Sequence, residues 1–208
     1  MSSSRRERTR ARILEAGNEL LLEGGYHGVG LETVARAAGV TRQTVYDQFG
    51  SKSGLLGAMI ARSEELAGLP RHLQTVMGRI DGLSMLRAML DAIAAIEPLV
   101  YPYSRLVYAA RLDDPVAADM WNARMTSRRA GMGIVFARLA SDGRLRPGIG
   151  PEEAAEIAWA LTSPPQYEFL VIERGWSIER YRAHLEATIV ARLLTEVERQ
   201  KKQSRVRS

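Results

Sequence analysis

The sequence predicts an all-α protein, and three observations lead to that prediction. Apolar residues recur three and four positions apart along most of the 208 residues, as on the buried side of an amphipathic helix. The strict alternation of apolar and polar residues that marks a half-buried strand does not persist over a strand's length. Clusters of glycine, proline and aspartate divide the apolar pattern into segments of helical length.

Four helices are predicted before residue 70, each bounded by a residue that stops or caps a helix. Glycines tolerate the left-handed geometry at a helix end, and hydroxyl side chains accept bonds from the first free amides. The predicted helices cover about residues 13–23, 31–38, 42–48 and 52–67, with Gly24, Gly25 and Gly39 as stops and Thr41 and Ser51 as caps.

Longer helical patterns follow residue 70, and turn residues separate them. We expect Pro151 to open one helix and Ser177 to cap the last. Breaks are expected at Glu97-Pro98, Asp113-Asp114-Pro115, Asp142-Gly143 with Pro147-Gly148, and Ser163-Pro164-Pro165. The chain is therefore divided into an N-terminal helix-turn-helix domain, residues 1–57, and a larger C-terminal helical domain, residues 58–208.

The net charge of +5 is concentrated at the two ends of the chain. Residues 1–12 carry five arginines against Glu7, and residues 199–208 carry five basic residues and no acid, so the middle of the chain is mildly acidic. Basic tails attract polyanions such as nucleic acid, but they are equally typical of solvated, disordered ends. We expect both termini to be disordered.

Composition excludes several classes of protein. The chain has no cysteine, and its three histidines lack metal-ligand spacing, so neither a thiolate nucleophile nor a metal or other cofactor is expected. Apolar runs are too short for a membrane span, and a secretory leader is not recognisable, so we expect a cytoplasmic protein without membrane partners. Phosphate-binding and nucleophile-elbow motifs are also missing, which argues against an enzyme.

Residues 31–49 have helix-turn-helix spacing, with Gly39 at the bend between two short helices. In the second helix, Val45 and Phe49 are expected to pack inward. The solvent side then carries groups that can reach base edges in DNA: Arg42, Gln43, Thr44 and Asp47. The alternative is a solvated helix in another kind of helical protein.

Residues 10–60 resemble the tetracycline-repressor (TetR) family of bacterial transcription regulators. The resemblance rests on the pattern Val34-Ala35-x-x-Ala38-Gly39-Val40-Thr41-x-x-Thr44-Val45-Tyr46-x-x-Phe49-x-Ser51-Lys52-x-x-Leu55-Leu56. It implies a helix-turn-helix domain that binds double-stranded DNA, followed by a variable helical domain for ligand binding and dimerisation.

The resemblance also implies roles for individual residues. Tyr46 would place its hydroxyl on a DNA phosphate, and Lys52 would contact phosphate as a point charge. A cation at the start of a helix opposes the helix dipole, so we expect stability not to explain Lys52. Bases would be read by Arg42, Gln43 and Thr44, with phosphate or minor-groove support from Thr33, Arg6, Arg8 and Arg10.

Two positions depart from the family pattern. Gly30 replaces a capping hydroxyl at the start of the second helix, so a phosphate contact there is not expected. Gly54 stands where an acidic residue would complete a capping box, and we expect the fourth helix to begin more loosely for it.

The last two helices are expected to form a homodimer. The final helix has apolar residues on two sides, so one side can face its own domain and the other a partner, in a four-helix contact. The residues expected to take part are Trp159, Tyr167, Phe169, Tyr181, Leu185, Thr188, Val190 and Arg192. Both apolar sides of the final helix could instead belong to the core of a single chain.

A small-molecule effector site is expected within residues 80–170, where adaptable side chains replace leucine and isoleucine. Its expected lining is Met85, Met89, Tyr101, Tyr103, Tyr108, Trp121 and Met125. Such a site suits an apolar or aromatic compound, neutral or cationic rather than anionic. The sequence thus predicts a repressor released from a palindromic operator by an effector; the alternative is a constitutive DNA-binding dimer without a pocket.

Overall fold

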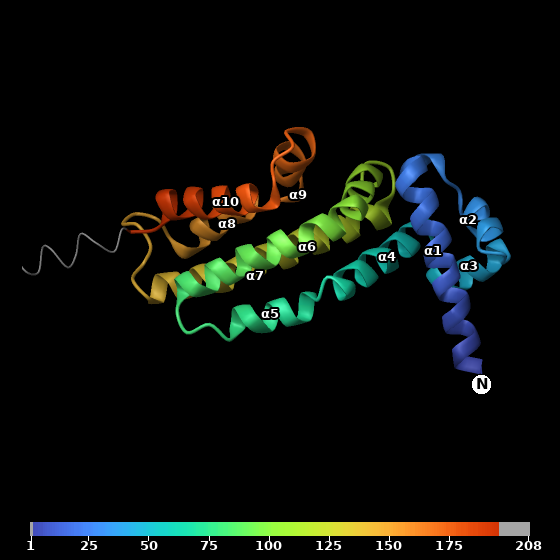
Figure 1. Ribbon diagram of the computed structural model, residues 1–208, viewed down its shortest axis with the longest axis horizontal. Coiled ribbons are helices and arrows are strands. Elements are labelled where there is room, and N and C mark those ends of the chain that lie inside the picture. Colours follow the sequence, from blue (N-terminus) through green and yellow to red (C-terminus); the bar gives the residue numbers. More distant parts are fainter. Residues whose placement is uncertain (1, 196–208) are drawn as a thin grey trace, which may run out of the picture. The chain divides into compact units, whose positions relative to one another are not determined.

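The protein is built of helices in the computed structural model, which describes residues 2–195 (Figure 1). Within that range there is no strand, and an isolated antiparallel bridge joins Leu145 and Leu194. The all-α prediction is confirmed. The helices are α1 (Ser2–Gly28), α2 (Leu31–Ala37), α3 (Arg42–Phe49), α4 (Lys52–Leu66), α5 (Leu69–Met77), α6 (Gly82–Ala110), α7 (Pro115–Ser141), α8 (Pro151–Leu161), α9 (Pro164–Tyr167), the π-helix η1 (Glu168–Glu173) and α10 (Ile178–Leu193).

The chain forms two compact units that do not follow a single cut in the sequence. The first unit combines the residues up to 70 with residues 95–126, and the second combines residues 71–94 with those from 127 onward. Helices α6 and α7 therefore each contribute to both units. The division of the chain into two domains at residue 57 stays a prediction.

The core of the first unit joins α1–α4 to the later helices α6 and α7. Figure 1 shows α2 and α3 beside α1, and side chains such as Ile13, Val34 and Leu55 are buried among these helices. Val107 of α6 and Ala117 of α7 belong to the same apolar cluster. Burial of apolar surface is the main favourable term in folding, so these later residues help to stabilise the first four helices.

The caps in this unit and the stop at Gly39 agree with the sequence, whereas α1 is interrupted by a kink at Gly25, with a φ of 72°, and resumes as far as Gly28. Thr41 accepts a hydrogen bond from the Thr44 amide at 3.1 Å, and Ser51 accepts one from the Gly54 amide at 2.9 Å. Gly39 has a φ of 65°, which side-chain-bearing residues rarely adopt. The bend between α2 and α3 therefore has the geometry that the spacing predicts.

Two expectations about helix boundaries are wrong. The basic N-terminal segment is the beginning of α1, because arginine, glutamate and alanine favour helix and the described residues before Gly17 include neither glycine nor proline. Glu97-Pro98 does not end a helix either, since α6 continues through Pro98 and Pro102. Flanking side chains such as Glu97 and Tyr101 are buried, and their packing offsets the lost backbone bonds. The basic tail of residues 199–208 lies outside the described residues.

The second unit is held together by aromatic and ionic contacts to α10. Tyr181 of α10 meets Tyr167 of α9 edge to face, with ring centroids 5.5 Å apart. Arg182 pairs with Asp91 of α6 at 2.7 Å, and Arg87 of α6 pairs with Glu186 at 2.7 Å. The inward row of α10 consists of Tyr181, Leu185, Ile189 and Leu193.

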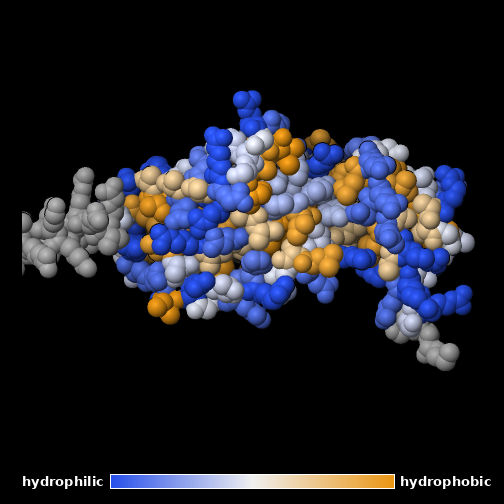
Figure 2. All heavy atoms as spheres, viewed as in Figure 1, coloured by the Kyte–Doolittle hydropathy of each residue, from blue (hydrophilic) through white to orange (hydrophobic). Residues whose placement is uncertain are grey.

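The described helices include none with a stretch long and apolar enough to cross a membrane. On the face drawn in Figure 2, hydrophobic groups reach the surface in small patches between hydrophilic side chains.

Candidate DNA-binding site

Helix α3 presents a polar face because its apolar residues point the other way. Val45 is fully buried in the core of the first unit, whereas the next residue, Tyr46, is 49% exposed. Arg42 and Gln43 are also exposed. A helix with its guanidinium, amide and phenol groups on one free face can place them in a major groove.

Two of the candidate base-reading side chains already have partners on α3 or at its N-cap. The Gln43 amide donates to the Asp47 carboxylate at 2.7 Å, one turn further along α3. The hydroxyls of Thr44 and Thr41 lie 2.8 Å apart at the helix start. Both arrangements hold the side chains in one orientation on the exposed face.

The predicted arm arginines belong to the ordered helix α1, and they differ in their surroundings. Arg6 and Arg8 are exposed. Arg10 instead lies with its guanidinium 4.5 Å from the centre of the Phe49 ring, and it donates to the Gln48 carbonyl at 3.5 Å. A cation at the C-terminal end of a helix interacts favourably with the helix dipole, so Arg10 also stabilises the end of α3.

Lys52 has an internal structural role that the sequence does not reveal. Its ammonium donates to the carbonyl of Tyr26 at 2.5 Å and to that of Val29 at 3.0 Å, and it lies 4.2 Å from the centre of the Tyr26 ring. The expectation that stability does not explain Lys52 is therefore wrong, because this cation satisfies one carbonyl in the last turn of α1 and one just after it. Burial lowers the pKa of Lys52, while the nearby carboxylates of Asp114 and Asp113 act in the opposite direction.

The expectation of a loose start for α4 is also wrong. A Cβ atom at Gly54 would lie 1.9 Å from the carbonyl oxygen of Phe49. Glycine lets α4 begin directly against the end of α3, and the Gly54 amide still receives its cap from Ser51. The tight turn, rather than a missing capping box, accounts for this residue.

Gly30 is the N-cap of α2 and has no side-chain cap, as its lack of a hydroxyl predicts.

A polar cluster beside Lys52 links α1 and α4 to the turn before α7. One carboxylate oxygen of Asp114, Oδ2, accepts hydrogen bonds from the Tyr26 hydroxyl and, at 2.5 Å, from the buried Ser53 hydroxyl. Its other oxygen accepts from the amides of Val116, at 2.9 Å, and Ala117, at 3.2 Å, and so caps α7. We name Tyr26, Ser53 and Asp114 the Asp114 cluster.

The protonation states of the Asp114 cluster follow from these bonds. Burial opposes ionisation of Asp114, but hydrogen bonds from Ser53 and Tyr26 outweigh burial and lower its pKa. Burial, followed by the hydrogen bond to the Asp114 carboxylate, raises the pKa of Tyr26 to about 12. At neutral pH the cluster therefore contains a carboxylate and two hydroxyl donors.

The sequence contains a signal for one half of this cluster. Aspartate directly before a helix that begins with proline is a typical N-cap, which would have identified the capping oxygen of Asp114. Its second oxygen could not be predicted, because Ser53 and Tyr26 lie 61 and 88 residues away in the chain.

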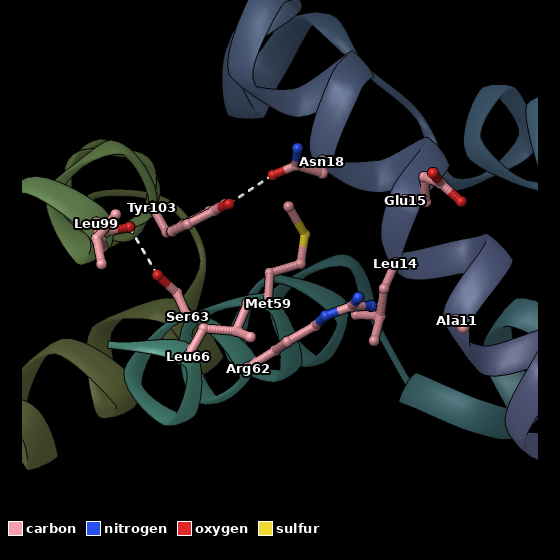
Figure 3. Close-up of a pocket in the computed structure, with 10 residues that line it drawn as sticks. All are labelled: Ala11, Leu14, Glu15, Asn18, Met59, Arg62, Ser63, Leu66, Leu99 and Tyr103. Atoms are coloured by element: carbon pink, nitrogen blue, oxygen red, sulfur yellow. Dashed lines mark hydrogen bonds between the residues drawn. The ribbon is translucent and has the colours of Figure 1, made fainter. Parts of the chain in front are cut away.

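The residues expected to line an effector site are divided between the two units, and their role stays a prediction. Met85 and Met89 belong to the second unit, and the other five belong to the first. Tyr108 packs against Trp121, with ring centres 4.7 Å apart, and Arg111 lies over the Tyr108 ring. A pocket in the first unit is formed between α1, α4 and α6, and of the seven residues it includes Tyr103 (Figure 3).

The residues expected at a dimer contact fall into two groups. Tyr167, Tyr181 and Leu185 are buried within their own chain, so their side chains are not available to a partner. Phe169 is 55% exposed, and Arg192 is exposed as well. The remaining members are partly buried: Trp159, Thr188 and Val190.

Comparison with known proteins gives a consistent family. Residues 13–59 match the model of bacterial regulatory proteins of the tetR family. The HTH-type transcriptional regulator UidR of Escherichia coli (strain K12) is 29% identical over 122 residues, which are 57% of this chain and 60% of UidR. The match thus spans less than two thirds of that relative.

Solved structures are similar over nearly the whole chain. NalD, the secondary repressor of the MexAB-OprM multidrug efflux pump in Pseudomonas aeruginosa, has a TM-score of 0.69 and 27% identity, over 92% of this chain and 99% of NalD. A Saccharomonospora viridis protein solved in complex with choline has a TM-score of 0.73 and 21% identity, over 94% of this chain and 100% of that one. The helix-turn-helix match and this shared fold show that the chain is similar to bacterial regulatory proteins of the tetR family.

Proposed function

We propose that the protein is a transcriptional regulator that binds a palindromic DNA operator as a homodimer through α3. The observation that carries this proposal is the division of α3 into a buried side at Val45 and an exposed side at Arg42, Gln43 and Tyr46. Side chains of these types form hydrogen bonds to base edges and phosphates. UidR and NalD, both named as regulators, support the same function.

The roles of individual residues belong to this proposal. Arg42, Gln43 and Thr44 read bases, and Gln43 exchanges its bond to Asp47 for a base edge. Tyr46 donates to a phosphate. Lys52 uses two of its three donors internally and directs the remaining one to the DNA backbone. Further support on the backbone or in the minor groove comes from Thr33, Arg6, Arg8 and Arg10.

The proposed dimer contact uses the outer side of α10. Ala183, Ala187 and Ala191 are exposed at every fourth position, and Val190 beside them is partly buried. Small side chains let two helices approach closely, and a row four residues apart lies along one helix face. A two-fold dimer places two recognition helices about 34 Å apart, one turn of DNA, which explains why the operator is palindromic.

We further propose that the regulator is a repressor and that a small apolar or aromatic effector releases it from DNA. NalD is a repressor, and the Saccharomonospora viridis protein was solved in complex with choline, so repression occurs in one protein of similar structure and small-molecule binding in another. Release requires an effector that binds better to a conformation unable to bind the operator. A constitutive DNA-binding dimer is the alternative, and a chain that no compound stabilises would favour it.

A titration of DNA selected from random palindromes tests the proposed function. Gln43→Ala should weaken binding to the selected operator by about 1–3 kcal/mol and relax the preference at one base position. Tyr46→Phe should weaken selected and unrelated DNA alike, because phosphate contacts carry no sequence information. Unchanged base preference for substitutions at Arg42, Gln43 and Thr44 would refute the assignment of α3 as the recognition helix.

A further inference from the structure

A pocket of about 380 Å³ lies between α1, α4 and α6, within the first unit (Figure 3). Small-molecule sites in proteins have volumes of about 300–1,000 Å³, so this pocket is large enough for a small ligand. Its lining consists of Ala11, Leu14, Glu15 and Asn18 of α1, Met59, Arg62, Ser63 and Leu66 of α4, and Leu99 and Tyr103 of α6.

The inner part of the pocket is apolar. Leu14 and Met59 are buried and provide hydrocarbon and thioether surface. The polar groups of the wall are paired with each other: the Tyr103 hydroxyl donates to the Asn18 side-chain oxygen at 2.6 Å, and the Ser63 hydroxyl donates to the Leu99 carbonyl at 2.6 Å. An apolar group can therefore enter beside these two hydroxyls without leaving either of them unsatisfied.

The rim of the pocket exposes large apolar side chains. Leu66 is 74% exposed and Leu99 is 50% exposed, although they stand beside a concave site. A single exposed leucine needs no explanation, but two at the mouth of one pocket form an apolar edge that a ligand can cover. The pocket and its rim thus favour a ligand with an extended apolar part.

The charge at the rim indicates which polar group such a ligand carries. Figure 3 shows Arg62 reaching from α4 across the pocket toward Leu14 of α1, while the Glu15 side chain lies farther along α1, away from Met59. Among the salt bridges of residues 2–195, none involves Arg62 or Glu15. The amide nitrogen of Asn18 adds a neutral donor on the opposite wall. A guanidinium without a carboxylate partner at an apolar pocket is suited to bind an anionic head group.

We propose that this pocket binds a monoanionic amphiphile, a carboxylate on a medium-length alkyl or aromatic body. The body packs on Leu14 and Met59 under Leu66 and Leu99, and the carboxylate accepts hydrogen bonds from Arg62. This ligand class differs from the neutral or cationic effector expected from the sequence, and only one of the residues expected for that effector, Tyr103, contributes here.

A ligand in this position contacts two helices that hold α3 in place. It fills the space between α1 and α4 while both helices pack against the recognition helix in the same apolar core. Its affinity therefore depends on the arrangement of α1 and α4, and by linkage DNA affinity depends on the ligand. This effect on DNA rests on the proposed function, whereas the ligand site itself does not.

Calorimetric titration with three probes of equal chain length tests the site: octanoate, 1-octanol and octyltrimethylammonium. We expect octanoate to bind about tenfold or more tightly than the other two, because only its head group accepts charge-assisted bonds from Arg62. Arg62→Gln should remove that preference and leave octanol binding unchanged. Ala11→Phe, which fills the pocket from α1, should weaken all binding, and Arg71→Gln, an exposed arginine outside the pocket, should change nothing.

Three outcomes would overturn the site. Equal affinity for the three probes, or octanoate binding that is unchanged in Arg62→Gln, would contradict the proposal that Arg62 binds the carboxylate. Absence of octanoate binding to the parent protein would contradict the proposal that the pocket binds a monoanionic amphiphile. Sedimentation showing that Leu66→Gln with Leu99→Gln converts a dimer into a monomer would assign the apolar rim to a contact between two copies of the chain.

The same preparation separates this inference from the proposed function. Octanoate binding by a protein that does not bind any selected palindrome supports the pocket and contradicts the DNA-binding proposal. DNA binding without octanoate binding contradicts the pocket and supports the function. When both are present, an octanoate-dependent change in operator affinity that Arg62→Gln abolishes supports the coupling, and an unchanged operator affinity overturns it.

Discussion

Tyr26, near the end of α1, donates its hydroxyl to the carboxylate of Asp114, 88 residues later in the turn between α6 and α7. Ser53 at the start of α4 donates to the same oxygen. The Asp114 cluster therefore fixes the first and fourth helices to the turn that begins α7. A residue outside the predicted helix-turn-helix domain is thus part of the framework that positions the recognition helix.

Asp114→Asn should destabilise the protein by about 1.5–3 kcal/mol, because hydrogen bonds to a charged group are stronger than neutral ones. Tyr26→Phe should cost less, and the double variant should show coupling between the two positions. Urea unfolding measures these differences. Asp113→Asn is the matched control, since that neighbouring carboxylate is mostly exposed; an equal loss at both aspartates would contradict the role of the cluster.

The Asp114 cluster also predicts how stability depends on pH. The lowered pKa of Asp114 means that its contribution is present above the pKa of an unfolded aspartate, about 3.9, and is lost as the pH falls through the lower folded value. The raised pKa of Tyr26, about 12, means that its contribution is lost as the pH rises from about 10 toward that value. Unfolding measured across pH should show the acid loss diminished in Asp114→Asn and the alkaline loss diminished in Tyr26→Phe.

Lys52→Met should reduce both stability and DNA binding. The loss of two bonds from a charged donor to the Tyr26 and Val29 carbonyls should cost about 1.5–3 kcal/mol of stability. The loss of one phosphate contact should lower the slope of DNA affinity against salt concentration by about one. An unchanged slope in a folded Lys52→Met protein would restrict this lysine to its internal role.

Substitutions at two glycines should have opposite effects on stability. Gly54→Glu would complete a capping box in the sequence, yet we expect it to destabilise because its Cβ would overlap the Phe49 carbonyl. Gly30→Ser should stabilise by a few tenths of a kcal/mol, because its Cβ meets open space and its hydroxyl can cap α2. Thermal unfolding compares the two, and a stabilising Gly54→Glu would show that the turn between α3 and α4 relaxes readily.

Val190→Glu and Leu185→Glu should separate dimerisation from folding. Val190 lies beside the exposed alanine row, so Val190→Glu should give a folded monomer with weakened operator binding. Leu185 is buried in its own chain, so Leu185→Glu should reduce folding stability by several kcal/mol instead. Sedimentation with circular dichroism distinguishes the two results; a parent protein that is monomeric at micromolar concentration would end the dimer proposal.

Local patterns predicted local structure well. Spacing, caps and glycine stops identified the two helices of residues 31–49, and the inward Val45 beside the outward Tyr46 followed from helical periodicity. The resemblance that these residues carry agrees with the tetR family model, which matches residues 13–59. Such features depend on residues within about one helical turn of each other, and these neighbours can be read directly from the sequence.

Features that depend on distant residues could not be predicted in the same way. The continuation of α6 through Pro98 depends on packing around its buried neighbours, and the carbonyl partners of Lys52 lie more than 20 residues earlier in the chain. The pocket between α1, α4 and α6 differs from the predicted lining because methionine and aromatic residues on a helix also occur in ordinary cores. Periodicity identifies the buried side of a helix but not the element that covers it.

The shared core of the first unit has a consequence for synthesis of the chain. Helices α1–α4 are made first, but Val107, Ala110 and Ala117 complete their apolar cluster. A nascent chain that has just released α4 from the ribosome therefore exposes apolar surface that its own residues cannot yet cover. The recognition helix can reach its final stability only after the first turn of α7 has been translated.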